Sequence, residues 1–186
     1  MDVKKAIENR RAYRSFDHID ITKELIKDLA ECARLAPSCF NNQPWRYIFV
    51  HEKEILDKMH TALSPGNDWG KYSSMIIAVL SKNEMDCQMK DGREYYAYDV
   101  GTATGFMILR ATELGIVLHP IAGYDPVKVR EILKIPDDLS VMTLLIAGKH
   151  SDKISPVLSE KQIESEKNRP ERLDPEKIFS ENKYNF

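Results

Sequence analysis

The chain has 186 residues, of which 42% are hydrophobic and 30% are charged, which suits one globular domain and excludes fibrous, collagen-like and wholly disordered proteins. Its 27 Lys and Arg residues against 29 Asp and Glu residues give a formal net charge of −2, so no global positive field exists to attract nucleic acid or an anionic membrane. No apolar run approaches the roughly 20 residues that span a bilayer, and the N-terminus lacks a signal-peptide core, so we expect a cytoplasmic protein.

The first elements along the chain are two helices separated by a basic segment. Residues 3–12 begin with apolar side chains at helical spacing and predict a short amphipathic helix. Thr22 predicts the N-cap of a second helix, whose apolar period of 3.6 residues continues until Pro37 prevents it. A polar, turn-rich loop follows over residues 37–45.

The middle of the chain alternates strands and helices. The patterns predict strand 46–50, helix 55–63, strand 75–80, helix 95–114, strand 117–121, helix 126–133 and strand 141–147. The continuous apolar run at 75–80 predicts a central strand buried on both faces. Gly101 and Gly105 lie on one face of a predicted helix and indicate close helix packing, which a subunit interface could supply. Helices outnumber strands without a strict βαβ alternation, which indicates an α+β fold with a mixed sheet.

The chain after Gly148 differs in composition from the rest. Most of its residues are charged or polar, and such a segment cannot form its own core. It is therefore either disordered or docked on another surface. Its isolated apolar residues, which would dock it, are Leu158, Ile163, Leu173, Ile178, Phe179, Tyr184 and Phe186.

Arginine residues gather at the end of the first predicted helix. Arg10 and Arg14 are about one helical turn apart, and Arg11 lies beside them. Guanidinium groups match phosphate oxygens in pairs, so the cluster predicts a phosphate site. The alternative is a solvated basic helix end that complements the helix dipole, and the spacing by itself favours neither.

The loop at 37–45 combines a hydroxyl, a thiol, three side-chain amides and two aromatic rings. Amides offer donors and acceptors in fixed planes, as needed to read the edge of a heterocycle. The alternative is that the loop only makes turns and fills core. Cys32, Cys39 and Cys87 form no CxxC pair, which favours reduced thiols and argues against structural zinc. The histidines show no paired spacing, so we expect no metal site, and we interpret Cys39 as a packed residue rather than a nucleophile.

Several motifs together resemble the FMN-dependent nitroreductase family. They are RRAYRSF at 10–16, PSCFNNQPWRYIFV at 37–50, LGIVLHPIAGYD at 114–125 and a Val-rich strand that ends in glycine. The resemblance extends from Ile7 to about Phe179. It implies an α+β homodimer with a mixed central sheet flanked by helices, intertwined through C-terminal extensions. Residues 1–150 would form the FMN-binding domain, and residues 151–186 would wrap the partner subunit.

The resemblance also implies cofactor-binding residues. Arg10 and Arg11 would bind the phosphate and ribityl chain, Arg14 would approach the pyrimidine end of the flavin, and Arg172, or else Arg169, would complete the phosphate site through docking of the tail in trans. The partner's loop residues Ser38, Cys39, Asn41 and Gln43 would cover the flavin. The residues along the ring would be Pro120, Ile121, Ala122 and Gly123, with Asn67 and Lys71 nearby. Ala12 and Cys39 stand where serine is common, and Ala122 where some relatives carry glutamate.

The implied activity passes hydride from NAD(P)H through flavin N5 to nitroaromatic or quinone acceptors in a ping-pong cycle, without a catalytic side chain. A specialised flavin enzyme of the same fold, dehalogenating or flavin-consuming, is the nearest alternative, because the acceptor pocket would involve variable loops such as 82–94. An RNA-binding module that uses Arg10, Arg11 and Arg14 is an alternative from another class. The net charge of −2 argues against it.

Overall fold

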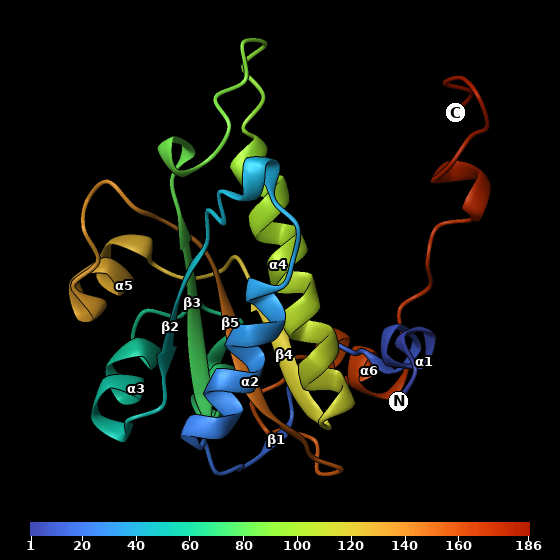
Figure 1. The fold of residues 1–186 in the computed structure, drawn as a ribbon. Coiled ribbons are helices and arrows are strands. Elements are labelled where there is room, and N and C mark those ends of the chain that lie inside the picture. The colour runs from blue at the N-terminus through green and yellow to red at the C-terminus, as the bar shows by residue number, and fades with distance from the viewer.

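The computed structural model describes residues 1–186, in which helices cover both faces of a five-stranded sheet (Figure 1). The helices are α1 (Val3–Asn9), α2 (Lys23–Arg34), α3 (Lys53–His60), α4 (Tyr95–Glu113), α5 (Pro126–Leu133) and α6 (Glu160–Lys167). The strands are β1 (Phe16–Asp17), β2 (Arg46–Val50), β3 (Met75–Ser81), β4 (Ile116–Ile121) and β5 (Ser140–His150). Short 3₁₀ turns occupy Cys39–Asn41, Asp68–Tyr72, Asn83–Met85 and Pro175–Lys177.

The sheet is antiparallel throughout. β3 pairs with β2 on one side and with β5 on the other, and β4 pairs with the far edge of β5. β1 pairs with the end of β5, beyond the residues that contact β3. The α+β class is confirmed, but the expected mixed sheet is not found within the chain, because every pair of hydrogen-bonded neighbouring strands is antiparallel. The consecutive strands β3 and β4 run in the same direction, but β5 lies between them.

The core lies on both faces of the sheet, as the apolar run in β3 predicts. Alternate residues of β3 point to opposite faces, so Ile77 packs with α2 and α4 while Ile76 packs with α3 and α5. Every residue of β3 is buried. The central strand therefore fixes both helical layers, and α4 crosses one whole face of the molecule (Figure 1).

The element ends follow local sequence signals. The side chain of Thr22 accepts a hydrogen bond from the Leu25 amide, and that of Asp125 accepts bonds from Val127 and Lys128, as expected of N-caps. Helix α1 ends at Asn9, earlier than predicted, because Arg10 leaves the helical region at ψ 121°. The segment after Arg10 instead runs along α6.

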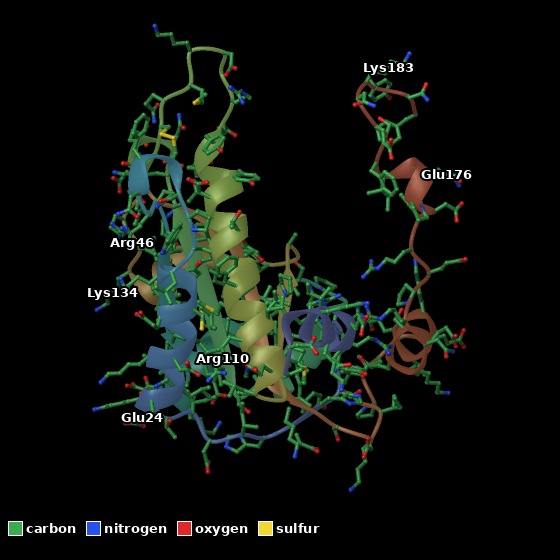
Figure 2. The ribbon with its side chains drawn as sticks, turned by 45° about the vertical axis from the view of Figure 1, so that its right-hand side comes forward. Glu24, Arg46, Arg110, Lys134, Glu176 and Lys183 are labelled. Atoms are coloured by element: carbon green, nitrogen blue, oxygen red, sulfur yellow. A yellow bond between two sulfur atoms is a disulfide. The ribbon has the colours of Figure 1, made fainter.

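The C-terminal part divides into two regions. Residues 151–167 pack on their own chain: Leu158 is buried and Ile163 contacts the core around α3 and α5. Helix α6, which we did not predict, starts with a capping box between Ser159 and Gln162. The chain beyond Arg172 then leaves the body, and Figure 2 displays the labelled Glu176 and Lys183 apart from it. No helix combines the length and hydrophobicity needed to cross a membrane.

Candidate functional site

Five arginines line one hollow of about 160 Å³ beside α1 and α6. They are Arg10, Arg11, Arg14, Arg169 and Arg172, and Ala12, Ser165 and Pro170 complete the lining. The structure thus brings together the basic residues that the resemblance implied, although the most distant pair in the sequence, Arg10 and Arg172, is 162 residues apart. All five belong to the same chain, so within this chain the group is assembled in cis, and completion by a partner's tail stays a prediction. The reason is that α6 folds back against the segment after α1 and carries Arg169 and Arg172 to it.

Two of these arginines hold helix ends. The guanidinium group of Arg11 donates to the carbonyl oxygens of Ser165 at 2.9 Å and Glu166 at 3.2 Å, near the end of α6. Arg169 donates to the carbonyl oxygens of Glu8 and Arg10 at the end of α1. The last carbonyl groups of a helix lack intrahelical partners. Arg11 and Arg169 therefore fasten the two helices to each other as well as adding charge.

The side chains of Arg10 and Arg172 make no hydrogen bond or ion pair, and no carboxylate lines the hollow. Burial, followed by the charges of Arg169, Arg172 and Arg11, lowers the pKa of Arg10. Clustered positive charge without a counterion disfavours the charged form and is relieved by a bound anion. Two free guanidinium groups facing one hollow suit the oxygens of a phosphate. The arrangement does not match a solvated helix end.

Glu166 is a functional candidate that we did not predict. Its side chain is only 1% exposed, and its carboxylate accepts hydrogen bonds from the backbone amides of Arg14 at 2.5 Å and Ser15 at 3.3 Å. Its Oε2 atom lies 3.9 Å from Nε2 of His150. In sequence Glu166 looks like any solvated acidic residue of a polar tail. Only its burial reveals that it holds the arginine segment in place.

Aromatic residues form the floor below Arg14. The ring of Trp69 stacks on that of His119 at a centroid distance of 4.7 Å, and the Arg14 guanidinium lies 5.9 Å from the Trp69 ring. Nδ1 of His119 lies 3.0 Å from the carbonyl oxygen of Tyr13, so this nitrogen must donate. Burial lowers the pKa of His119 to about 4. The imidazole is consequently neutral at physiological pH.

The residues expected along a flavin ring begin next to this floor. Nδ2 of Asn67 donates to the carbonyl oxygen of Gly123 at 2.8 Å, and a Cβ atom on Gly123 would come within 2.4 Å of that nitrogen. Glycine is therefore required for this contact. Ile121 is buried, whereas Pro120 and Ala122 are exposed. Lys71 pairs with Asp68 at 3.0 Å.

The loop that carries Ser38, Cys39, Asn41 and Gln43 lies far from the arginine hollow within one chain. The Cys39 amide donates to Asp99 near the start of α4, whereas the N-terminal amine beside α1 pairs with Glu113 at the end of α4. Asp99 and Glu113 are 14 residues apart on α4, which separates these two points by about 21 Å at 1.5 Å per residue. Asn41 is exposed, and the Ser38 hydroxyl accepts from the Gln43 amide at 3.0 Å. Within the chain this loop cannot touch a ligand in the hollow.

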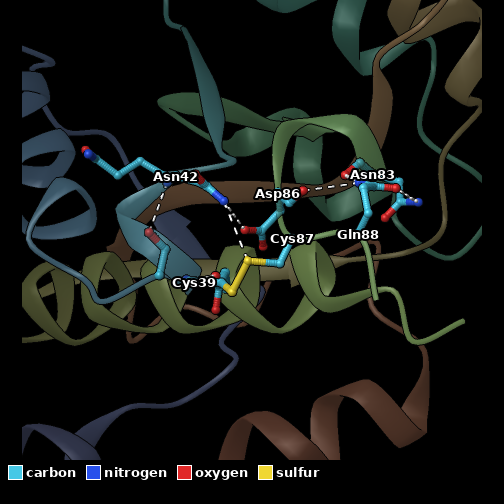
Figure 3. Close-up of a disulfide and its surroundings, with 9 residues drawn as sticks. Cys39, Asn42, Asn83, Asp86, Cys87 and Gln88 are labelled. Carbon is cyan, nitrogen blue, oxygen red and sulfur yellow. Dashed lines mark hydrogen bonds between the residues drawn. A yellow bond between two sulfur atoms is a disulfide. The ribbon is translucent and has the colours of Figure 1, made fainter. Parts of the chain in front are cut away.

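The cysteine prediction is wrong in part, because Cys39 and Cys87 form a disulfide (Figure 3). Cys32 is the free cysteine. The pair is separated by 48 residues, and spacing cannot reveal partners that are brought together only when two distant loops meet. Cys39 is thus neither a nucleophile nor a simple packed thiol in this structure.

Fold and hollow together define an α+β protein with an arginine-lined hollow built from two distant segments. The sequence profile of the nitroreductase family matches residues 7–74. A protein of Archaeoglobus fulgidus named for NADH dehydrogenase and NAD(P)H nitroreductase is 31% identical over 156 residues, which are 80% of this chain and 85% of the relative. The FMN reductase (NAD(P)H) of Bacillus subtilis is 24% identical over 168 residues, covering 82% of this chain and 67% of the relative.

A solved structure described as an oxidoreductase containing FMN superposes with a TM-score of 0.85 and 26% identity, covering 100% of this chain and 94% of that one. The chain belongs to the nitroreductase family. The family resemblance inferred from the motifs is therefore confirmed.

Proposed function

We propose that the protein is an FMN-dependent oxidoreductase that transfers hydride from NAD(P)H to small nitroaromatic or quinone acceptors. The observation that carries this proposal is the hollow with five arginines and no carboxylate. The names of the relatives support it, since two refer to NAD(P)H and one of them to FMN. A phosphate, rather than the whole cofactor, is the group that the hollow fits directly.

The free side chains of Arg10 and Arg172 would contact the phosphate, while Arg11 keeps its bonds to α6. Arg14 would carry positive charge toward the ring, where Trp69 lies below its guanidinium at 5.9 Å. Lys71, Asn67 and the segment 120–123 would line the ring beside it. Asn67 would hold that segment in position through its bond to Gly123.

When bound, FMN supplies the hydride-accepting and hydride-donating chemistry of a ping-pong cycle. The chain's own residues would bind FMN, orient its ring and leave one face of the ring open to the substrates. Because the pKa of His119 is lowered to about 4 and its Nδ1 proton is bonded to Tyr13, His119 keeps the floor neutral. No side-chain acid or base is needed, and positive charge from Arg14 would favour an anionic reduced ring.

A homodimer would complete the site, with the partner's Ser38, Cys39, Asn41 and Gln43 covering the flavin. The exposed face of α4 supports this arrangement: Tyr98 and Phe106 are exposed, and a Cβ atom on Gly101 or Gly105 would meet open space. The five apolar anchors of the tail, Leu173, Ile178, Phe179, Tyr184 and Phe186, are 57–83% exposed. Each contributes roughly 1.5 to 3 kcal/mol if buried. The assembly would function in the cytoplasm.

Removing residues 173–186 tests the dimer while keeping Arg169, Arg172 and α6. We expect the truncated dimer to dissociate into monomers at a higher protein concentration than the full-length dimer, as measured by sedimentation. Its far-ultraviolet circular dichroism spectrum should be unchanged. A cut before Ser151 would be a poorer test, because Leu158 and Glu166 belong to the subunit's own interior. A truncated protein with the dimer stability of the full chain would exclude the tail from the interface.

The cofactor is tested by the visible spectrum of the purified protein and by chromatography of what it releases on denaturation. We expect FMN. Release of FAD, or a colourless protein that binds no added FMN, would remove the basis of the proposal.

Steady-state rates with nitroaromatic, quinone, halogenated and free-flavin acceptors would separate the proposed activity from a specialised enzyme of the same fold. The RNA-binding alternative has little support, since the arginines line a hollow rather than an open surface.

A further inference from the structure

A second cluster of functional groups lies around the disulfide, near the start of α4, and consists of sulfur atoms and carboxylates. Sγ atoms of Cys39 and Cys87 and a carboxylate oxygen of Asp86 all lie within 4.8 Å of one another. We propose that these three residues form a binding site for a thiophilic divalent cation such as Zn²⁺ when the disulfide is reduced, and that disulfide formation closes the site. The proposal does not depend on flavin binding.

The donor atoms suit such an ion. Zn²⁺ binds cysteine sulfur at about 2.3 Å and carboxylate oxygen at about 2.0 to 2.2 Å, usually with four ligands. Cys87 follows Asp86 directly in the chain, and Cys39 faces them from the loop before β2 (Figure 3). Both cysteines are half-buried rather than buried, and a water molecule would provide the fourth ligand.

The carboxylate beside the sulfurs lacks the partners that a buried charge requires. Asp86 is only 7% exposed. Its Oδ1 atom accepts a hydrogen bond from the side-chain Nδ2 of Asn42 at 3.2 Å, whereas its buried Oδ2 atom has no hydrogen-bond partner. No basic side chain forms an ion pair with Asp86. A buried charged oxygen left unpaired is costly, so this atom favours a bound cation.

A second acidic residue strengthens this demand for positive charge. Asp99 is 2% exposed, accepts from the Cys39 amide at 2.7 Å and forms no ion pair. Two buried carboxyl groups therefore lie beside the sulfurs without a basic partner, and a divalent ion would supply the missing positive charge.

The redox state determines whether the sulfurs can act as ligands. A dithiol reductant gives its two electrons and two protons to the disulfide, so that two thiols form and the reductant becomes a disulfide. Binding of one divalent ion then releases the two thiol protons, because thiolates are the ligands. Reoxidation by a disulfide oxidant joins the sulfurs again and frees the ion.

Cobalt(II) is a suitable probe, because its d–d bands in a tetrahedral site lie to the red of flavin absorption. The full-length protein, flavin included, is reduced, freed of reductant anaerobically and titrated with Co²⁺. We expect these bands to grow to one equivalent and to be abolished by Zn²⁺, while oxidised protein produces none. Their absence from reduced protein whose thiols have been counted as free would overturn the proposal.

Variants assign the ligands. Cys39→Ser and Cys87→Ser should lose the cobalt signal, whereas Cys32→Ser, the matched control at the third cysteine, should keep it. Asp86→Asn leaves the disulfide intact and should weaken binding by about tenfold or more, with thermal melts to establish that it folds. Equal affinity in Asp86→Asn and wild type would remove Asp86 from the site, and a signal that requires Cys32 would refute the site altogether.

Discussion

The two ends of α4 differ in charge and in what holds them. At one end, arginines gather around a hollow, and hydrogen bonds of Arg11 and Glu166 hold them. At the other end, Asp86 and Asp99 are buried beside a covalent disulfide. The arginines of the hollow form no ion pair, and neither do Asp86 and Asp99. The contrast indicates that the basic end is built for binding, with adjustable polar support, while the acidic end contributes more to stability through its bond.

Breaking the disulfide should have the largest effect on this contrast. For Cys87→Ala we expect a loss of about 2 to 4 kcal/mol in the free energy of unfolding, because a bridge over 48 residues restricts the unfolded chain. Denaturant unfolding of the oxidised proteins measures it. Cys32→Ala is the control for removing a thiol. A loss no larger than that of the control would show that the acidic end does not depend on its bond.

Arg10→Ala should affect binding and spare stability. Removing a charge-assisted bond to phosphate should weaken FMN affinity by about 1.5 to 3 kcal/mol, measured by flavin titration of the apoprotein. The melting temperature of the apoprotein should not fall, since burial and the neighbouring arginines already disfavour this charge. Lys5→Ala, an exposed cation of α1 outside the hollow, should change neither quantity. Unchanged FMN affinity in Arg10→Ala would contradict the proposed phosphate contact.

Glu166→Gln sharpens the comparison, because it disturbs the support and leaves every arginine in place. We expect the free energy of unfolding to fall by about 1 to 3 kcal/mol, since a buried carboxylate that accepts from two amides is replaced by a neutral group. FMN affinity should fall as well. Glu171→Gln, which removes the same charge from an exposed residue of the tail, is the control. Wild-type values of both quantities would mean that Glu166 does not position the arginine segment.

Lowering the pH should slightly reduce the free energy of unfolding through His119, which lies below Arg14 at the arginine hollow. The pKa of His119 is about 4 in the folded protein, below its ordinary value of 6.5, so the unfolded chain binds more protons between these values. Stability that is present above about pH 6.5 is therefore lost as pH falls toward about 4. Between about pH 7.5 and 5.5 we expect His119 to account for about 1 kcal/mol. His119→Asn should remove that part of the pH dependence, and His51→Asn, at an exposed position, should retain it.

Local signals in the sequence determined most elements and the family. The caps at Thr22 and Asp125, the apolar run of β3 and the glycine after α4 act through contacts within a few residues, so their outcome is readable from the chain alone. The arginines were recognisable as candidates for the same reason. Their residue type and spacing are local properties.

Long-range packing decided what the sequence left open. The sheet is antiparallel because β5 lies between β3 and β4. Arg172 reaches Arg10 in the same chain because α6 folds back on the segment after α1. Glu166 acquired its role through burial, and Cys39 met Cys87 because two loops converge at the start of α4. Such pairings depend on the free energy of the whole fold. No local pattern encodes them, and the tertiary structure alone decides which distant groups share a site.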